Sequence, residues 1–419
     1  MSLQQQIIKM AQEAKKISYQ LAPVGSAEKD RALKLMADAL RAHQDYLIKE
    51  NKKDIKAAEK TKLNKALVDR LVLNEKRIAA MADSLLETIK LKDLIGEVLE
   101  TLKRPNGLVI KKIRVPLGVV GIIYESRPNV TSDCVGLCLK SGNVSILKGG
   151  KEAIFSNKAI FSVLKKALAQ TKIPVNAINL IESTDRAAVN HLLQLEEYVD
   201  VIVPRGGEEL IRFVAGHSKI PVIKHYKGVC HVYVSEHADL NMAHAIAMNA
   251  KVQRPGVCNA METLLVHNDV AIRFLPVLAN ELKKAGVELR GDSLTRKIVK
   301  KGVKAATEKD WSTEYLDLIL SVRVVDSLGQ AVEHINHYGS HHSDAIVTED
   351  KKEAEEFLRS VDSACVYANA STRFTDGYEF GFGAEVGIST DKLHVRGPMA
   401  LEGLTTYKYE ILGQGQVRT

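Results

Sequence analysis

The spacing of apolar residues changes character once along the chain, close to residue 105. Before that point apolar positions recur three and four residues apart, over Ile7–Ile17 and again over Leu33–Ile89. This periodicity is typical of amphipathic helices. Proline is absent from Val24 to Arg104. The first region is therefore predicted to be a set of packed helices with solvated Lys/Glu faces.

A β-hairpin is predicted around the turn Pro105-Asn106-Gly107, because apolar residues flank it on both sides, at Leu102 and at Leu108–Ile110. Beyond it, short apolar runs alternate with helical stretches. The predicted strands are Val119–Tyr124, Val144–Lys148, Ala177–Glu182, Val199–Val203 and Val222–His225. Strand–helix alternation predicts a parallel sheet covered on both faces, and such sheets bind ligands at the carboxyl ends of their strands.

A second α/β stretch is predicted from His231 onward. Its strands are expected at His231–Val234, Glu262–Val266 and Leu318–Val325, with helices over Ala238–Ala250 and Val270–Ala285. Glycine becomes frequent from Gly377 to Gly403. That last stretch is predicted to be rich in loops, which often cover functional sites.

Composition narrows the class of protein. The chain has 419 residues, and no apolar run in it approaches the ~18 residues that cross a bilayer. Its start also lacks the compact apolar block of a signal peptide, so we expect a cytoplasmic protein with no membrane role. The net charge is +8, but the lysines are scattered and aromatics make up only 5%. The charge therefore favours a small anionic substrate or a phosphorylated cofactor over nucleic acid.

Five cysteines are present, and no two of them form a Cys-x-x-Cys pair. The sequence thus argues against a zinc site and against a disulfide framework, while one reactive thiol stays open. His225 and the pair His341-His342 have no carboxylate at metal-ligand spacing. No metal site is predicted.

Two glycine turns follow predicted strands and open helices, which suits an anion at the helix N-terminus. One is Lys148-Gly149-Gly150-Lys151 and the other contains Arg205, Gly206 and Gly207. Glycine lets the backbone approach a ligand closely. Taken alone, the first turn is also compatible with an ordinary solvated turn and does not match the G-x-G-x-x-G dinucleotide fingerprint. The second turn taken alone is more typical of a tight connection with a surface arginine.

Two further residues are candidates for catalysis. Cys258 follows Pro255-Gly256 directly before an apolar strand, and Arg254 beside it would favour the nucleophilic thiolate. The alternative is a buried structural cysteine. Asn129 stands at the carboxyl end of the first strand of the sheet, where its amide would donate to a developing oxyanion. The alternative for Asn129 is a helix cap.

Longer stretches of the chain carry a family resemblance. They are VPLGVVGIIYESRPNVTSD at 115–133, LKSGNVSILKGGKEA at 139–153, VPRGG at 203–207, QRPGVCNAMETLL at 253–265 and GFGAEVGISTDKLHVRGPMAL at 381–401. Together they resemble the gamma-glutamyl phosphate reductases, a family within the aldehyde dehydrogenase superfamily. The resemblance covers nearly the whole chain.

The resemblance implies reduction of L-glutamyl 5-phosphate by NADPH to L-glutamate 5-semialdehyde and phosphate, the second step of proline synthesis from glutamate. Cys258 would form a thioester, and Asn129 with the Cys258 backbone N–H would hold the oxyanion. Another acyl phosphate or acyl-CoA reductase of the same superfamily is the nearest alternative. A cofactor-binding scaffold without catalysis is a second one, although it leaves Cys258 unexplained.

Two departures from the wider superfamily refine what the resemblance implies. The segment that matches Glu-Leu-Gly-Gly in hydrolytic members reads Lys224-His225-Tyr226-Lys227-Gly228 here. It has no water-activating carboxylate, and Lys224 or His225 would hold phosphate instead. The superfamily's Lys-Pro-x-Glu cofactor turn reads Lys148-Gly149-Gly150-Lys151, which favours NADPH over NADH. Asp317 matches the glutamate that contacts the nicotinamide ribose.

The same resemblance implies the architecture and the partners. The fold would be α/β, with a Rossmann-type NADPH-binding domain (1–99 and 117–230), an α/β catalytic domain (231–396) and small oligomerisation elements (100–116 with 397–419). Arg127, Arg254 and Arg396 would anchor the substrate's carboxylate and phosphate. The protein would form a homo-oligomer, and a transient contact with the glutamate kinase that makes the substrate stays open.

Overall fold

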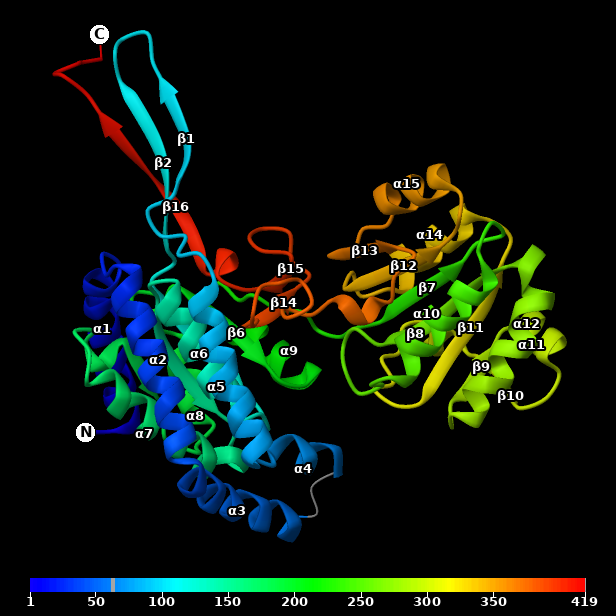
Figure 1. The fold of residues 1–419 in the computed structure, drawn as a ribbon, viewed down its shortest axis with the longest axis horizontal. Coiled ribbons are helices and arrows are strands. Elements are labelled where there is room, and N and C mark those ends of the chain that lie inside the picture. Colours follow the sequence, from blue (N-terminus) through cyan, green and yellow to red (C-terminus); the bar gives the residue numbers. More distant parts are fainter. Residues whose placement is uncertain (62–64, 419) are drawn as a thin grey trace. The chain divides into compact units, whose positions relative to one another are not determined.

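The computed structural model describes residues 1–61 and 65–418, with only the backbone for 65–67. The chain divides into two compact units. Unit 1 contains Met1–Lys224, Gly381–Gly387 and the C-terminal segment from Pro398; unit 2 contains His225–Phe380 and Ile388–Gly397. The α/β fold predicted from the sequence is confirmed (Figure 1).

Unit 1 begins with the predicted helices and continues as a strand–helix alternation. Its helices are α1 (Leu3–Leu21), α2 (Ser26–Ala42), α3 (Gln44–Lys60), α4 (Lys65–Leu71), α5 (Glu75–Lys90), α6 (Asn129–Lys140), α7 (Ile154–Leu168), α8 (Ala187–Leu193) and α9 (Glu208–His217). Its strands are β1 (Val98–Lys103), β2 (Val109–Pro116), β3 (Val119–Tyr124), β4 (Val144–Gly149), β5 (Ile178–Leu180), β6 (Val201–Arg205) and β16 (Thr405–Leu412).

The central sheet of unit 1 has the strand order β5-β4-β3-β6, and all its pairs are parallel. Every residue of β3 and β4 is buried, as expected for strands with helices on both faces. The chain runs outward from β3 through β4 to β5 and then returns to the other side of β3 as β6. This reversal is the topological switch point at which open α/β sheets bind ligands.

The hairpin predicted around Asn106 is confirmed, because β1 pairs with β2 in antiparallel register. The C-terminal strand β16 adds to the other edge of β2, also antiparallel. Figure 1 shows this three-stranded sheet projecting from the rest of unit 1, with β1 in cyan and β16 in red. Every residue of β1 is exposed.

One predicted strand is wrong. Val222–His225 makes a single isolated bridge, between Val222 and Ile202 of β6, and no ladder. The Pro221 carbonyl accepts from Ile202 N, and Ile223 N donates to the Ile202 carbonyl, both at 2.9 Å. Pairing ends there because the chain then leaves the sheet edge and crosses into unit 2 after Lys224.

Unit 2 is built on a seven-stranded parallel sheet. Its strands are β7 (Cys230–Val234), β8 (Met261–His267), β9 (Glu288–Gly291), β10 (Val303–Ala305), β11 (Ile319–Val325), β12 (Ser343–Val347) and β13 (Cys365–Ala368), in the order β10-β9-β11-β8-β7-β12-β13. Its helices are α10 (Leu240–Val252), α11 (Asn268–Lys284), α12 (Ser293–Val299), α13 (Glu308–Trp311), α14 (Leu328–Tyr338) and α15 (Lys351–Ser360). Two short strands, β14 (Gly387–Ser389) and β15 (Gly397–Met399), pair where the chain passes between the units.

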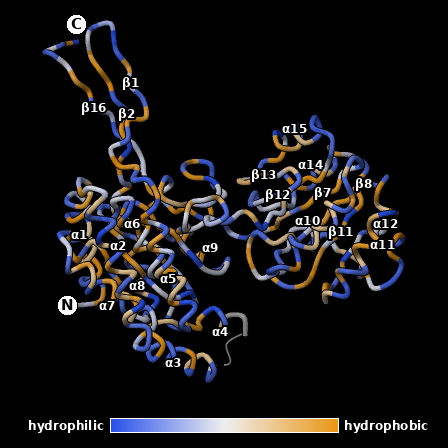
Figure 2. The backbone as a smooth tube through the Cα atoms, viewed as in Figure 1, coloured by the Kyte–Doolittle hydropathy of each residue, from blue (hydrophilic) through white to orange (hydrophobic). Residues whose placement is uncertain are grey.

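The core of each unit follows from its strands. β7 and β8 are buried along their whole length, and Figure 2 shows hydrophobic residues along these strands of unit 2. In unit 2 the apolar stripe of α11, from Val270 to Leu282, packs with β8 and β11 into one cluster. None of the helices among the described residues is long and apolar enough to span a membrane.

Candidate active site

Three loops that carry predicted site residues begin at the same edge of the unit 1 sheet. The register pairs Tyr124, the last residue of β3, with Gly149 of β4 and with Arg205 of β6. The turns after these residues therefore share the carboxyl edge of the sheet, at the switch point between β3 and β6. This edge is where an open α/β sheet holds a nucleotide.

The Lys148–Lys151 turn presents one exposed and one buried lysine. Lys148 Nζ donates to the Gly149 carbonyl at 2.8 Å, and burial lowers the pKa of this ammonium. Lys151 is exposed at the start of the helical segment. The residue after this turn, Glu152, has a carboxylate to which the sequence analysis gave no role. Glu152 Oε1 accepts from Ser126 N at 2.6 Å and from Ser126 Oγ at 2.9 Å.

The Arg205–Gly207 turn is closed by another carboxylate. Glu125 Oε2 accepts from Gly207 N at 3.0 Å, and a Cβ at Gly206 would lie 2.4 Å from that same oxygen. The Gly207 amide at the N-terminus of α9 is thus already bound to a protein anion. Burial raises the pKa of Glu125. Arg205 lies 3.5 Å from Glu385 Oε1.

Asn129 is not the cap of its helix. It is the first residue of α6, where Pro128 holds the cap position and no side-chain cap bond forms. Instead, Asn129 Nδ2 donates to Asp133 Oδ2 at 2.9 Å, one turn further along. The capping alternative is therefore wrong. The Asn129 side chain is exposed and oriented by Asp133, and an amide has a second N–H to offer.

Cys258 differs from the other four cysteines. Cys134, Cys138, Cys230 and Cys365 are buried, whereas Cys258 is half-buried, on the loop between α10 and β8. Burial raises the pKa of Cys138 to about 12 and holds the pKa values of Cys134 and Cys230 well above the usual range. Those three thiols cannot supply a thiolate near neutral pH. Cys258 is therefore the cysteine that fits the reactive thiol considered in the sequence analysis.

The backbone at Cys258 is held by close contact with Gly228. A Cβ on Gly228 would lie 1.8 Å from the Cys258 carbonyl oxygen and 2.7 Å from its Cα, so only glycine fits. Gly228 N donates to Glu314 Oε1 at 2.9 Å. The Cys258 carbonyl also accepts from Cys230 Sγ at 3.2 Å. The loop that carries the thiol is thus fixed from the side of the Lys224–Gly228 segment.

A buried ion pair lies below the same loop. Lys251 Nζ donates to Glu262 Oε2 at 2.6 Å, and both side chains are fully buried. Glu262 Oε1 accepts from the backbone N–H groups of Tyr315 and Leu316, at 3.2 and 3.1 Å. Burial raises the pKa of Glu262 to about 7, and Lys251 acts against that shift. The pair therefore ties the two ends of the Cys258 loop to the segment that leads to Asp317.

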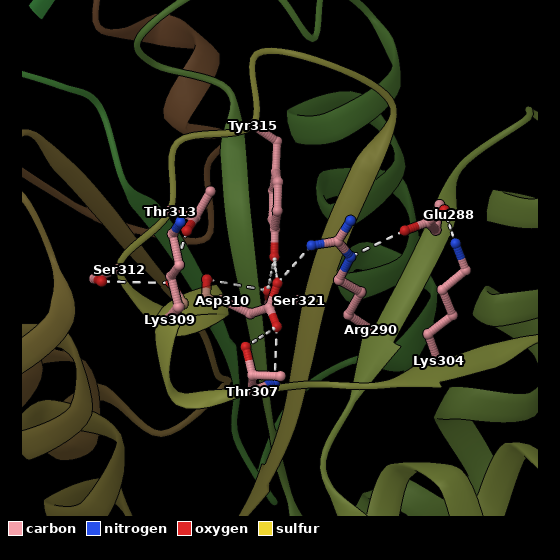
Figure 3. Close-up of polar contacts among 10 residues, drawn as sticks. All are labelled: Glu288, Arg290, Lys304, Thr307, Lys309, Asp310, Ser312, Thr313, Tyr315 and Ser321. Carbon is pink, nitrogen blue, oxygen red and sulfur yellow. Dashed lines mark hydrogen bonds and ion pairs between the residues drawn. The ribbon is translucent and has the colours of Figure 1, made fainter.

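The segment before Asp317 is anchored a second time at Asp310, as Figure 3 shows. Asp310 accepts from Arg290 at 2.6 Å and from Tyr315 Oη at 2.8 Å. Tyr315 Oη also lies 2.8 Å from Ser321 Oγ. A cavity of about 420 Å³ opens beside this network. Asp317 itself is exposed, and its Oδ1 accepts from Leu318 N at 2.7 Å.

Arg373, which the sequence reasoning missed, is a second cation near the nucleophile. Its guanidinium donates to Gln253 Oε1 at 2.9 Å and to Asn259 Oδ1, on either side of Cys258 in the sequence. Burial lowers the pKa of Arg373, and the charge of Arg254 acts in the same direction. Arg254 itself is exposed. No local signal marks Arg373, which lies more than a hundred residues downstream.

Two imidazoles lie beside the thiol. The ligand atoms of His225, Cys258 and His342 are all within 4.8 Å of one another. His225 Nδ1 lies 2.9 Å from the Ile388 carbonyl, and its ring centroid is 5.5 Å from that of His342. His342 is fully buried. No local pattern links these three residues, because they are far apart along the chain.

Arg396, Arg127 and Lys224 are the remaining residues predicted to bind the substrate. Arg396 donates to Asp362 Oδ1 at 2.8 Å and to the Asp362 carbonyl at 3.0 Å, and these bonds hold the pKa of Asp362 down at about 2. The guanidinium of Arg396 is therefore already bound by Asp362. Arg127 follows β3 in unit 1, and Lys224 is the last residue of that unit before the crossing; both are half-buried.

Comparison with known proteins places this geometry in a family. The model of the aldehyde dehydrogenase family matches residues 2–297. Gamma-glutamyl phosphate reductase of Nautilia profundicola is 54% identical over 99% of this chain and 99% of its own, and that of Moorella thermoacetica is 57% identical over 97% of each. This chain belongs to the gamma-glutamyl phosphate reductases, within the aldehyde dehydrogenase family. The family resemblance predicted from the sequence is confirmed, and the chain is an oxidoreductase.

Solved structures agree with that assignment. The crystal structure of gamma-glutamyl phosphate reductase from Thermotoga maritima has a TM-score of 0.96 and 47% identity, covering 99% of this chain and all of that one. An acetylating aldehyde dehydrogenase from Geobacillus thermoglucosidasius reaches a TM-score of 0.70 at 19% identity, over 100% of this chain and 98% of its own. The second likeness shows the shared fold alone.

Proposed function

We propose that this chain reduces L-glutamyl 5-phosphate with NADPH, giving L-glutamate 5-semialdehyde, NADP⁺ and phosphate in the second step of proline synthesis. The observation that carries the proposal is the state of Cys258. It is a half-exposed thiol on a fixed loop beside a guanidinium, in a chain whose full-length relatives are named gamma-glutamyl phosphate reductases.

Cys258 acts as the nucleophile. Its thiolate sulfur forms a bond to the acyl carbon, and the bond from that carbon to the phosphate oxygen breaks, so phosphate leaves with the electron pair. The guanidinium of Arg373 holds the side chains of Gln253 and Asn259 on either side of this nucleophile. An acyl phosphate already carries a good leaving group, and no strong general acid is needed.

The oxyanion of the tetrahedral intermediate is held by hydrogen-bond donors. Asn129 and the Cys258 backbone N–H are the proposed donors, and each is typically worth about 3–4 kcal/mol. NADPH, when bound, supplies the hydride that reduces the thioester. The oxyanion that remains then re-forms a carbonyl, the carbon–sulfur bond breaks, and Cys258 regains its thiolate as the aldehyde leaves.

Water is kept from competing because the segment facing the nucleophile loop offers no base of the hydrolytic kind. The segment Lys224–Gly228 contains no carboxylate. A thioester at Cys258 would therefore wait for hydride instead of being hydrolysed.

Lys224 or His225 would hold the phosphate group, and Arg127, Arg254 and Arg396 are the proposed anchors for the substrate's anionic ends. Arg396 would have to share its guanidinium with Asp362.

The cofactor is proposed to bind unit 1 at the carboxyl edge of its sheet. Lys148, Gly150 and Lys151 would meet the adenosine 2′-phosphate, and Lys151 is exposed for that contact. Glu152 does not oppose it, because its Oε1 is bound by Ser126. Arg205, Gly206 and Gly207 would line the same edge. Glu125 at that turn suits a ribose hydroxyl better than a phosphate, since a carboxylate repels an anion. On unit 2, Asp317 would contact the nicotinamide ribose.

This assigns a role to each part of the chain. Unit 1 binds the cofactor, unit 2 carries the nucleophile, and the β1-β2-β16 sheet joins copies of the chain into a homo-oligomer. The last role is supported by apolar side chains that stand exposed on that sheet, namely Val98, Leu99, Leu102, Ile411 and Leu412. Exposed apolar patches of this kind mark interfaces. A transient contact with the kinase that makes the unstable substrate belongs to the same proposal.

The test is NADPH oxidation in a coupled assay with glutamate, ATP and a glutamate kinase. We expect oxidation only when all three are present, faster with NADPH than with NADH. The same enzyme is then given acyl-CoA substrates. Activity with acyl-CoA alone would overturn the proposal in favour of an acyl-CoA reductase of the same superfamily.

A further inference from the structure

His225, Cys258 and His342 form a cluster of one sulfur and two nitrogen donors within unit 2. Each pair of ligand atoms lies within 4.8 Å. In a tetrahedral zinc site, Zn–S bonds of about 2.3 Å and Zn–N bonds of about 2.0–2.1 Å separate the ligand atoms by roughly 3.3–3.6 Å. Side-chain shifts of about 1 Å would therefore close the cluster around one ion.

The two imidazoles make hydrogen bonds like those that histidine ligands make through the ring nitrogen that does not bind the metal. His225 Nδ1 is held by the Ile388 carbonyl at 2.9 Å. His342 Nδ1 lies 2.8 Å from Ser343 Oγ, which in turn lies 2.7 Å from Thr375 Oγ1. Protein groups on one ring nitrogen fix the tautomer and orient the other nitrogen toward a metal. The two rings are thus held before any ion arrives.

The choice of ion follows from the ligand types. One thiolate and two imidazoles suit Zn²⁺, whereas Mg²⁺ and Ca²⁺ prefer oxygen ligands. Three protein ligands also leave a fourth position open for water or for a substrate oxygen.

We infer that His225, Cys258 and His342 form a Zn²⁺ site that blocks the nucleophile. Binding exchanges the thiol proton for the metal, so that one proton leaves per ion bound. The sulfur then holds Zn²⁺ and cannot attack the acyl phosphate. The inhibition rests on the proposed role of Cys258, whereas the binding does not.

Metal binding is measured on the full chain with Co²⁺ as a spectroscopic probe and Zn²⁺ in competition with a chromophoric chelator. We expect one ion per chain and a thiolate-to-cobalt charge-transfer band. Cys258→Ser should remove the band. His342→Gln should weaken Zn²⁺ binding about tenfold or more. His225→Gln, at a half-exposed position, should have an effect of the same size.

The matched control is His341→Asn. His341 precedes His342, but its Nδ1 lies beside the Asp362 carbonyl instead, and asparagine tolerates the left-handed backbone there (φ 58°). It should bind Zn²⁺ like the parent. Co²⁺ binding without a thiolate band, or equal loss in the His341 and His342 variants, would overturn the site.

The activity assay separates the two proposals. Zn²⁺ should inhibit NADPH oxidation at concentrations that fill the site, and a chelator should restore the rate. Full occupancy with an intact rate would leave the metal site standing and overturn Cys258 as the nucleophile. Absence of binding would overturn the metal site and leave the reductase proposal as it is.

Discussion

Gly228 lies so close to Cys258 that its missing side chain is a requirement of the site. A Cβ there would stand 1.8 Å from the Cys258 carbonyl oxygen, far inside any real contact. The clash would involve backbone atoms, which cannot rotate away as a side-chain end would. Any substitution at Gly228 must therefore displace the loop that carries the thiol.

Gly228→Ala should lower kcat by about a hundredfold, because a shift of about 1 Å in a reacting group has that order of effect. The matched control is Gly256→Ala, two residues before Cys258, where the nearest atom to a new Cβ is 3.6 Å away. Steady-state kinetics and thermal unfolding of both variants check this. Similar rates for the two variants would show that the contact has no bearing on catalysis.

The buried pair of Lys251 and Glu262 predicts a pH dependence of stability. The pKa of Glu262 is raised from 4.5 to about 7 in the folded protein, so the folded state binds the extra proton between these values. The free energy of unfolding should therefore fall as pH rises from about 4.5 to 7, by up to about 3 kcal/mol from this group.

The check is the unfolding midpoint of the parent and of Glu262→Gln at several pH values in that window. Glutamine cannot titrate, so the variant should lose this part of the slope. Parallel pH profiles for the two proteins would contradict the assignment. Glu262→Gln should also be less stable at pH 8, because it leaves the Lys251 ammonium buried without its anion, a loss of about 3–5 kcal/mol.

Asn129→Ala should lower kcat by roughly 10²–10³-fold with little change in KM, as expected for a donor to the oxyanion. The helix should keep its stability, because Asn129 makes no cap bond. Asp133→Asn tests the support of this amide separately and should have a smaller effect. A raised KM with unchanged kcat would instead make Asn129 a ground-state binding residue.

Lys151→Glu should weaken NADPH binding by more than it weakens NADH binding, because a carboxylate there repels the 2′-phosphate. Lys158→Glu is the control, since Lys158 lies on α7 and pairs with Glu182. Fluorescence titration of both cofactors gives the ratio. Equal effects on the two cofactors would remove Lys151 from cofactor selection.

The exposed apolar strands predict the oligomeric state. Ile411→Asp or Leu99→Asp should dissociate the proposed homo-oligomer, because each replaces an exposed apolar side chain of the β1-β2-β16 sheet with a charge. Light scattering coupled to size-exclusion chromatography measures the mass. Tyr19→Asp, an exposed aromatic on α1, is the control. An unchanged mass in both sheet variants would rule out this sheet as the interface.

Local sequence patterns predicted the strands well where both faces of the strand are buried. β3 is a nearly continuous apolar run, β4 carries Val144, Ile146 and Leu147, and the turn at Asn106 predicted the hairpin that the structure has. Val222–His225 failed because its apolar residues lie against β6 at one point only. Asn129 was found by its position after β3, although its hydrogen bond to Asp133 has no signature in the sequence.

The contacts around Cys258 were beyond local reasoning. Arg373, Glu314 and His342 lie more than fifty residues downstream of Cys258, and only the tertiary fold brings them to the thiol or to the segments beside it. Composition and spacing carry no information on such contacts. The family resemblance supplied the nucleophile, and the structure supplied what surrounds it.

The most direct test of Cys258 as the nucleophile is the rate of NADPH oxidation with enzymatically generated glutamyl phosphate, in the parent and in Cys258→Ser. Cys138→Ala, a buried thiol of unit 1, is the control. We predict that Cys258→Ser binds NADPH like the parent but loses at least about a thousandfold in kcat, while Cys138→Ala keeps its rate. Turnover by Cys258→Ser near the parent rate would contradict covalent catalysis at Cys258.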